Sequence, residues 1–505
     1  MVHPDNKRLE EQEDIKEQHP DISESNEHLD RIKKVHELRA HGIEPWPARH
    51  EKITSSCKQI LEAKAEDTEY SLAGRIMTMR AHGKAIFCHL QDATGQLQLY
   101  IKEDVIGEAT FALCRDYLDI GDIVWVRGIT FTTKVGEFTL RVLELVLLSK
   151  SLHPLPEKFH GLADVEIKLR QRYLDLITNE ETRERFRRRS QIIAQLRSFL
   201  DNHGYIEVET PMLQPIPGGA AAKPFVTHHN ALDMELFLRI APELYLKRLL
   251  VGGFEKVYEI NRNFRNEGIS TRHNPEFTML EFYTAYRDYH YIMDFVTTMF
   301  RELVLTTCGT LQAPFGDKTI NFDNFRRLSP EEAVIEFGSI PKAELSPEKI
   351  DATCQRMNIK ISPSENHQKK IFTLFEACAE SRIVDPVFIV EFPIDISPLA
   401  RRDDKNPLIA ARFELFIAGM ELSNGFNELN DPFDQAERFK EQAQIRAQGD
   451  DEAMYYDANF IRALEYAMPP AVGVGIGIDR LVMLLTNTTS IRDVILFPTL
   501  KRKQD

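Results

Sequence analysis

The sequence predicts an α+β protein with more than one domain, and three observations support this prediction. The chain has 505 residues, which exceeds one ordinary domain and suits two or three. Five short segments with the strand period of two are crowded into residues 70–150. Longer hairpin patterns occur at 257–283 and 412–423, among segments with helical spacing. We therefore expect a small β-barrel followed by a larger domain of strands and helices.

Charge and cysteine content narrow the class of protein. The formal net charge of -15 argues against non-specific coating of nucleic acid, although a local basic groove is compatible with it. The six cysteines include no C-x-x-C pair, so neither a zinc knuckle nor a disulfide framework is suggested, and a reducing compartment fits. The sequence has no run of 18 apolar residues and no apolar signal segment. We expect a cytoplasmic protein without membrane association.

The first part of the chain predicts a helical extension and then the barrel. Residues 1–65 are expected to form the extension, because apolar residues recur at helical spacing within 28–41. Residues 66–150 are expected to form an OB-type barrel, a fold that often binds single-stranded nucleic acid. Phe87 suits base stacking and the barrel core equally well. The candidates for phosphate, stacking and base-edge contacts are Arg75, Arg80, Phe87 and Gln98.

The larger domain is expected at 181–505, after a proline-punctuated linker at 151–180. A helix is predicted from Thr182 to His203, and its arginines fit a solvated face better than an RNA contact. A helical insertion is predicted at about 329–382, because this segment contains capping-box spacing.

The most informative stretch is the hairpin at 257–283. From Glu276 onwards the period is two, which predicts one strand face made of Phe277, Met279, Glu281 and Tyr283. The preceding loop carries charged side chains and closes where proline follows an asparagine, namely Arg265, Glu267, Arg272, His273 and Asn274. A solvated, charged turn is the simpler interpretation, but cations opposite a carboxylate and a phenol suggest a binding site.

A second hairpin brings two glutamates together. A two-residue turn at 418–419 would pair Phe416 with Glu421, so that Glu414 and Glu421 share one face. Two such carboxylates repel each other unless a cation lies between them, and Mg²⁺ favours one or two carboxylates plus phosphate oxygens. An exposed sheet edge is the alternative interpretation.

The residues that follow have the opposite parity. Asn424, Phe426 and Glu428 can join the same pocket only through a β-bulge, which we expect at Asn424-Gly425. Near the end of the chain, three glycines alternate on one strand face, which leaves room for a flat ligand. These are Gly473, Gly475 and Gly477, followed by a helix that opens with Asp479 and Arg480.

These segments resemble the three motifs of the class II aminoacyl-tRNA synthetases. Gly204 to Pro211 resembles motif 1, the F-R-x-E core at 264–267 with R-H-N-P-E-F resembles motif 2, and G-I-G-I-D-R-L at 475–481 resembles motif 3. The whole hairpin is similar to the lysine-specific branch, and the resemblance extends from about residue 30 to 500. It implies an anticodon-binding OB barrel and a catalytic domain built on an antiparallel β-sheet flanked by helices.

The resemblance implies a ligase that activates L-lysine with ATP, releases pyrophosphate and transfers lysine to the 3′ end of tRNA(Lys). It also implies Mg²⁺ and a homodimer, with the motif 1 proline at the interface. The alternatives are an aspartate- or asparagine-specific relative, a lysine-activating enzyme that modifies a protein, and a non-catalytic RNA-binding paralogue. Relatives that modify proteins lack the barrel, and a pocket of glutamates suits a cationic amino acid.

Specific roles are carried over only where motifs match. Catalytic roles are implied for Arg265 and Arg480, and metal ligation for Glu414 and Glu421. ATP contacts are implied for Arg265, Glu267, Arg272, His273, Asn274, Phe277, Glu414, Gly477 and Arg480. Lysine contacts are implied for Gly219, Glu243, Arg265, Glu281, Tyr283, Asn424, Phe426 and Glu428. Anticodon contacts are implied for Arg75, Arg80, Phe87 and Gln98, whereas Met79 stands where a basic residue is expected.

Overall fold

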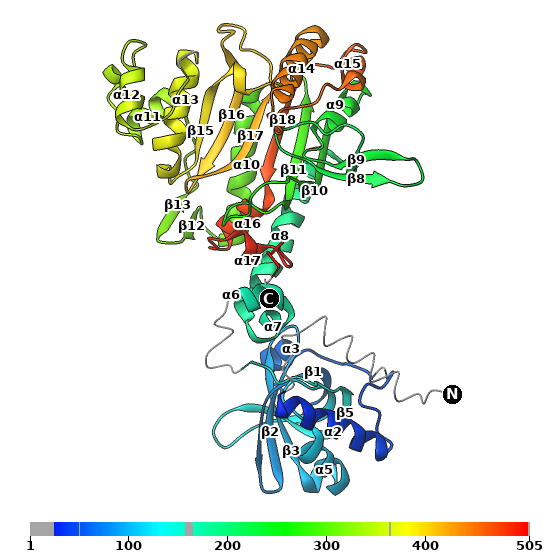
Figure 1. Cartoon of the computed structure of the whole chain (residues 1–505). Coiled ribbons are helices and arrows are strands. Elements are labelled where there is room, and N and C mark those ends of the chain that lie inside the picture. Colours follow the sequence, from blue (N-terminus) through cyan, green and yellow to red (C-terminus); the bar gives the residue numbers. More distant parts are fainter. Residues whose placement is uncertain (1–24, 50, 157–164, 363–364, 503–505) are drawn as a thin grey trace. The chain divides into compact units, whose positions relative to one another are not determined.

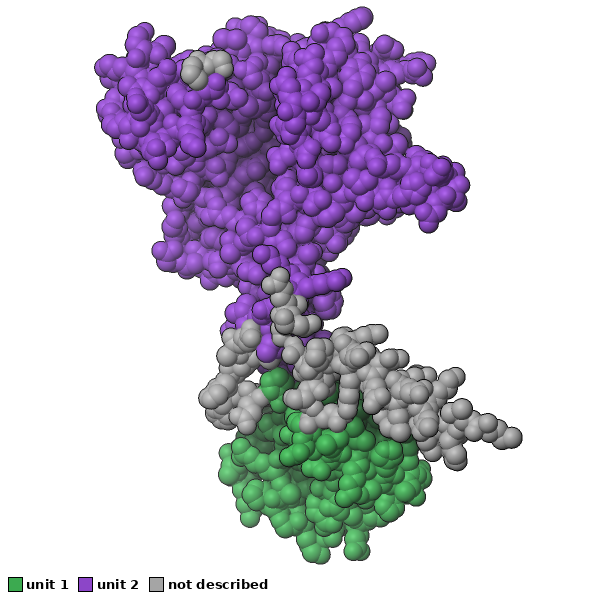
Figure 2. Space-filling view, in the orientation of Figure 1, with its two compact units in different colours: residues 1–163 green, residues 164–505 purple. Residues whose placement is uncertain are grey.

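A computed structural model describes residues 25–49, 51–156, 165–362 and 365–502. The chain divides into two compact units, residues 1–163 and 164–505, which are coloured separately in Figure 2. The expected linker range contains two short helices of the second unit, α6 (Val165–Arg170) and α7 (Arg172–Thr178). These helices belong to the second unit because Arg172 of α7 is buried and donates to the carbonyls of Leu496 and Arg492 near the end of the chain.

The first unit contains the predicted five-stranded barrel. The strands close in the order β1-β2-β3-β5-β4 and are β1 (Glu69–His82), β2 (Ala85–Gln91), β3 (Gln96–Lys102), β4 (Ile123–Thr132) and β5 (Phe138–Ser149). The period of two is clear in β2, where Ile86, Cys88 and Leu90 point into the core. Helices α4 (Glu103–Ile106) and α5 (Glu108–Tyr117) follow β3, and the sequence interpretation missed both.

Two further helices precede the barrel, α2 (Asn26–Ala40) and α3 (Cys57–Ala63). The side chain of Ser25 caps α2 by accepting from the backbone N–H of His28. Leu38 of α2 and Cys57 of α3 are buried in the barrel core. Residues 1–24 of the expected extension lie outside the described residues.

The second unit is built on an eight-stranded sheet in the order β14-β15-β16-β17-β18-β11-β10-β6 (Figure 1). All pairings from β15 to β10 are antiparallel, whereas the outer strands β14 and β6 pair in parallel. The strands are β6 (Ile206–Glu207), β10 (Lys256–Phe264), β11 (Glu276–Ala285), β14 (Arg326–Leu328), β15 (Val387–Pro393), β16 (Ile409–Ile417), β17 (Met420–Asn427) and β18 (Ala471–Gly477).

Several helices pack against this sheet, and others belong to further hydrophobic clusters. Apolar residues of α8 (Glu180–Asn202), α10 (Tyr289–Cys308) and α16 (Ile478–Leu485) share one core with the sheet. The predicted insertion contains α11 (Pro330–Glu336), α12 (Ile350–Arg356) and α13 (His367–Cys378), which have a core of their own. A third cluster includes α9 (Glu243–Val251), α14 (Pro432–Ala447) and α15 (Ala458–Leu464).

The remaining elements of the second unit are short. Three strands form a separate small sheet, namely β7 (Leu213–Gln214), β8 (Phe225–His229) and β9 (Met234–Leu238), and β12 (Gln312–Phe315) pairs with β13 (Lys318–Asn321). The short helices not yet mentioned are η1 (Lys342–Glu344), η2 (Glu380–Arg382), η3 (Ile394–Ile396) and α17 (Ile491–Val494). Within the described ranges, no helix is both long and apolar enough to span a bilayer.

The β16–β17 hairpin confirms one prediction and corrects another. Phe416 pairs with Glu421 as predicted, but the expected bulge at Asn424-Gly425 is wrong. Because the next pair is Leu415 with Ser423, the extra residue is Leu422, whose side chain is buried in the core. This bulge brings Asn424 opposite Glu414.

Candidate functional site

Two adjoining pockets are lined in part by β11, β17 and β18 and share Arg265, Met279, Asn424 and Gly475. We call the first the arginine pocket; its lining includes Arg265, Glu267, Arg272, His273, Asn274, Phe277, Glu421, Gly477 and Arg480. We call the second the acidic pocket; its lining includes Gly219, Glu243, Glu281, Tyr283, Phe426 and Glu428. All residues predicted to contact lysine line the acidic pocket, and all predicted ATP residues except Glu414 line the arginine pocket.

The predicted strand face on β11 connects the two pockets. Phe277 opposes Asn263 and Tyr283 opposes Val257, so the register of the hairpin is regular along its whole length. Phe277 lines the arginine pocket, Met279 lines both pockets, and Tyr283 lines the acidic pocket. The period of two therefore carries this face from one pocket into the other.

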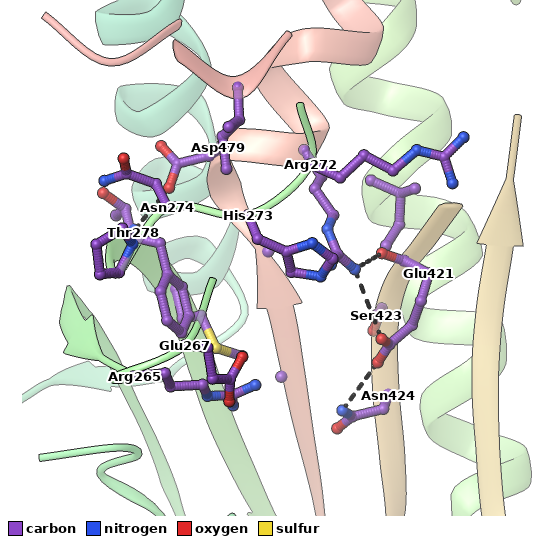
Figure 3. A pocket seen from close by; sticks show the side chains of 18 of the residues that line it. Arg265, Glu267, Arg272, His273, Asn274, Thr278, Glu421, Ser423, Asn424 and Asp479 are labelled. Carbon is purple, nitrogen blue, oxygen red and sulfur yellow. Dashed lines mark hydrogen bonds and ion pairs between the residues drawn. The ribbon is translucent and has the colours of Figure 1, made fainter. Parts of the chain in front are cut away.

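Arg265 is the cation common to both pockets. Figure 3 shows Arg265 and Glu267 on one wall of the arginine pocket, with Glu421 and Asn424 of β17 opposite. The guanidinium carbon of Arg265 lies 5.1 Å from the ring centroid of Phe277. The buried Nε of Arg265 has no hydrogen-bond partner among the described residues. Burial lowers the pKa of Arg265, and the charge of Glu267 opposes this shift. A buried guanidinium with an unused donor is suited to bind an anionic group.

Arg480 provides a second cation at the opposite side of the arginine pocket. It donates from Nη1 to the backbone carbonyl of Glu421 at 2.7 Å, and its Nη2 lies 3.1 Å from Nε2 of His273. Burial and the charge of Arg480 lower the pKa of His273, so this imidazole is neutral at pH 7. Arg272 donates to the carbonyl of Gly419 at 2.7 Å, and the side chain of Asn274 donates to the carbonyl of Glu276.

The start of the Arg480 helix is fixed by a residue that the sequence interpretation assigned to a solvated face. Arg189 of α8 donates to Asp479 at 2.7 Å and to the hydroxyl of Thr278 at 3.1 Å. The other carboxylate oxygen of Asp479 accepts from the backbone N–H of Thr278 at 2.7 Å. The solvated-face prediction is therefore wrong for Arg189. No local pattern could have revealed a partner 290 residues away.

Glu414 lies in a recess beside the arginine pocket. It shares this recess with Glu421, Glu380 and Arg412, and it forms an ion pair with Arg412. Burial raises the pKa of Glu414 to about 8, and the negative charges of Glu421 and Glu380 add to the shift. Among the residues that the structure describes, no group of three or more His, Cys, Asp or Glu could hold a metal ion. Two carboxylates that repel each other still fit Mg²⁺, which takes its other ligands from phosphate and water.

The acidic pocket contains three buried carboxyl groups. Glu243, Glu281 and Glu428 are each less than one-tenth exposed. Burial raises the pKa of Glu281 to about 8, with the charge of Glu243 adding to it, whereas the hydroxyl of Tyr283 donates to Glu281 at 3.0 Å. Burial also raises the pKa of Glu428 to about 8. Three acids in one enclosed space strongly favour a ligand with positive charge.

The sequence interpretation missed Lys247, which lies against this pocket. Its side chain has no exposed surface, and its ammonium is 2.6 Å from Oε1 of Glu243 and forms an ion pair with Glu428. The ammonium also lies 5.3 Å from the ring centroid of Phe426. The four-residue spacing from Glu243 on a helix is a signal that could have revealed half of this contact.

Glycines provide the space for these side chains. A Cβ atom on Gly473 would overlap Glu428 and the ring of Tyr283, whereas one on Gly477 would meet nothing closer than 3.9 Å. Gly219 has φ +88°, and a Cβ atom there would lie 2.9 Å from that of Glu243. The prediction that the alternating glycines accommodate a flat ligand thus omitted a second role, because Gly473 makes room for protein side chains.

On the barrel, Phe87 is half-buried on the outer face and is absent from the hydrophobic core. Its ring is 4.8 Å from that of Tyr100, which is 5.8 Å from that of Phe131. The guanidinium of Arg141 lies over Phe131 at 4.9 Å. The sequence interpretation missed Tyr100, Phe131 and Arg141, which extend one aromatic and basic surface.

The other three candidates for anticodon contact differ in exposure and in the hydrogen bonds that they already make. Arg80 is exposed and opposes Phe87 on the neighbouring strand. Arg75 is half-buried and donates to the carbonyl of Gly121 at 2.7 Å. The side-chain oxygen of Gln98 accepts from the hydroxyl of Thr139 at 2.7 Å. Arg80 and Phe87 are therefore the most available of the four for an outside partner.

Comparison with known families agrees with this architecture. The family described as tRNA synthetases class II (D, K and N) matches residues 164–501, and the family described as OB-fold nucleic acid binding domain matches residues 70–148. The chain therefore belongs to the class II tRNA synthetases.

Individual relatives define the branch of the family. The chain is 56% identical to the lysine–tRNA ligase of Thiobacillus denitrificans, with 88% of this chain and 89% of the relative covered. It is 53% identical to that of Ralstonia nicotianae, with 90% of each covered. It is 49% identical to that of Thioalkalivibrio sulfidiphilus, with 97% and 99% covered. Within its class, the chain belongs to the lysine–tRNA ligase family.

Proposed function

We propose that this lysine–tRNA ligase binds lysine in the acidic pocket and ATP in the arginine pocket, and joins them beside Arg265. The observation that carries the proposal is that these two pockets of opposite charge adjoin and share Arg265. The lysine would react with ATP to give lysyl-adenylate and pyrophosphate. The lysyl group of the adenylate would then be transferred to the 3′ end of tRNA(Lys), with release of AMP.

The acidic pocket supports lysine over aspartate or asparagine. Glu428 and Tyr283 would hold the ε-ammonium at the end of the pocket, with Phe426 along the alkyl chain. Glu243 and Glu281 would hold the α-ammonium. An aspartate side chain would instead meet carboxylates, which would repel it, and Glu428 would gain no cationic partner.

Activation brings the carboxylate of lysine to the α-phosphate of ATP, so two anions must approach each other. Arg265 and Asn424 would hold the carboxylate, and Arg265 would also reach the α-phosphate. Arg480, Arg272 and His273 would hold the outer phosphates as negative charge develops on the leaving pyrophosphate. Positioned cations of this kind stabilise the transition state without reorganisation, and no covalent enzyme intermediate is required.

The remaining side chains would bind the adenine base and the metal ion. Phe277 would stack on adenine, Glu267 would accept from its amino group, and Asn274 and Gly477 would line the nucleotide. Glu414 and Glu421 would hold Mg²⁺, which would neutralise charge on the phosphate chain. Burial and the negative charge of Glu421 together raise the pKa of Glu414, which supports a cation at this place.

The barrel surface formed by Arg80, Phe87, Tyr100, Phe131 and Arg141 would bind the anticodon, with Arg75 and Gln98 at its margin. A homodimer through motif 1 is supported by β6, which ends the eight-stranded sheet and exposes Ile206. All six cysteines are free thiols, which supports the cytoplasm as the compartment.

The decisive experiment is ATP–pyrophosphate exchange measured with each of the twenty amino acids. We expect lysine alone to support exchange well above background, because it alone of the twenty brings a second ammonium on an unbranched alkyl chain. Efficient exchange with aspartate or asparagine and none with lysine would overturn the proposal.

A further inference from the structure

The acidic pocket contains one more carboxylate than lysine can pair with. Lysine brings two ammonium groups, whereas Glu243, Glu281 and Glu428 supply three acids. The carboxylate of the substrate is matched by Arg265. A buried carboxylate without a cationic partner is costly, so the third acid needs a partner within the protein.

Lys247 provides this partner. Its ammonium is completely buried, lies 2.6 Å from Glu243 and forms an ion pair with Glu428. Burial alone would lower the pKa of Lys247, but the charges of Glu243 and Glu428 outweigh burial and raise it. Lys247 is therefore charged at pH 7.

Apart from Arg265, the other cations that act on these acids already have carboxylate partners. Arg412 of β16 acts on Glu243 but forms an ion pair with Glu414. Arg239 acts on Glu281 but lies 2.6 Å from Glu259. Tyr283 faces the acids from β11 and is neutral, because burial raises its pKa well above the ordinary value. Among the described residues, Lys247 is the buried cation that pairs with two acids of the pocket.

We propose that Lys247 is a specificity-determining positioning residue, a built-in counterion that favours the ionised forms of Glu243 and Glu428 and orients both side chains. When all three acids are ionised beside bound lysine, Lys247 leaves them a net charge of about -2, which matches the two ammonium groups of lysine. This inference rests on the proposed function, because it names the charge balance by which the same pocket selects its amino acid.

The test replaces Lys247 with neutral residues of similar length, Lys247→Met and Lys247→Gln. The control is Lys370→Met, which removes another buried lysine from a carboxylate pair. Its partner Asp351 is 62% exposed and lies in the helical insertion, so water can solvate the freed carboxylate. Exchange is measured with lysine and with 2-aminoheptanoate, which carries a methyl group in place of the ε-ammonium.

We expect both neutral variants to lose preference for lysine. Without Lys247, the pKa of Glu428 rises further, so this carboxyl group holds its proton more tightly and attracts a cation less. The ratio of kcat/KM for lysine to that for 2-aminoheptanoate should fall by about tenfold or more, as for loss of a charged hydrogen bond. The midpoint of the pH profile of kcat/KM for lysine should rise by about one unit. Neither quantity depends on the fraction of active enzyme, and Lys370→Met should change neither.

Thermal unfolding provides a test that does not require activity. In Lys247→Met the folded-state pKa values of Glu243 and Glu428 rise further above their unfolded values, so stability is lost as pH rises. Because the pKa of Glu428 in wild type is already about 8, the extra loss appears above that pH, and the deficit in Tm relative to wild type should be larger at pH 9 than at pH 7. In Lys370→Met it should be nearly the same at both values.

The possible outcomes separate this inference from the proposed function. If wild type does not activate lysine, the proposed function fails. If wild type activates lysine but the neutral variants keep its pH midpoint and lysine preference, only the inference fails. An equal Tm deficit at pH 7 and pH 9 would likewise reduce Lys247 to a packing role.

Discussion

The two pockets adjoin and share residues, yet they handle charge in opposite ways. In the arginine pocket, cations line the space and Arg265 keeps a buried donor that is not satisfied by any described residue. In the acidic pocket, carboxylates line the space and Lys247 already neutralises part of their charge. The first pocket suits a highly charged anion and the second a small cation. Arg265 lies where a carboxylate and a phosphate would meet.

Arg265→Ala is expected to have the largest effect on this comparison, because it removes the shared cation. Loss of one such donor costs about 2.7–4 kcal/mol, so lysine-dependent pyrophosphate exchange should fall by roughly 10²–10³ in kcat. Arg262→Ala, on the neighbouring strand β10, is the control, since its side chain is half-exposed beside Glu276. Equal exchange rates for wild type and Arg265→Ala would refute the assignment of the shared cation.

Gly473→Ala should damage the acidic pocket while sparing the arginine pocket. The added Cβ would overlap Glu428 and Tyr283, and overpacking of this kind costs about 1–3 kcal/mol. KM for lysine should rise by roughly tenfold, with a much smaller change in KM for ATP. Gly477→Ala is the matched control on the same strand, because its Cβ would meet ordinary contacts at 3.9 Å. An unchanged KM for lysine in Gly473→Ala would show that the overlap is relieved elsewhere.

Phe87→Ala should separate the barrel from both pockets. Loss of one stacked base costs about 1–3 kcal/mol, so KM for tRNA in aminoacylation should rise by roughly 5- to 100-fold. Pyrophosphate exchange, which requires no tRNA, should keep its wild-type rate. Val105→Ala, an exposed apolar residue on α4, serves as the control. Wild-type aminoacylation by Phe87→Ala would exclude this ring from the tRNA interface.

The smallest expected effect is the pH dependence of lysine activation, which distinguishes the two pockets in the wild-type enzyme. Glu281 and Glu428 have pKa values raised to about 8, and their carboxylate forms are the ones that attract ammonium groups. The kcat/KM for lysine should therefore rise several-fold from pH 6.5 to 8.5 as these acids lose their protons. KM for ATP should change less over this range. A flat profile for lysine would mean that neither acid titrates in the pocket before lysine binds.

Sequence patterns alone predicted the five barrel strands, the hairpins at 257–283 and 412–423, and the parity of Phe277, Met279, Glu281 and Tyr283. These features follow from backbone geometry, because alternate residues on a strand must share a face. The pattern also predicted that the β16–β17 hairpin needs a bulge. The resemblance to class II synthetases then supplied candidate roles. The candidate ATP residues other than Glu414 line one pocket, and the candidate lysine residues line the other.

The tertiary structure decided which distant groups meet. The bulge lies at Leu422 because that side chain reaches the hydrophobic core, which local turn chemistry does not encode. Arg189 meets Asp479, which lies 290 residues further along the chain, and Lys247 of α9 meets Glu428, which follows β17. Periodicity states which side chains share a face, but only the packing of that face against other elements determines its partners, burial and charge.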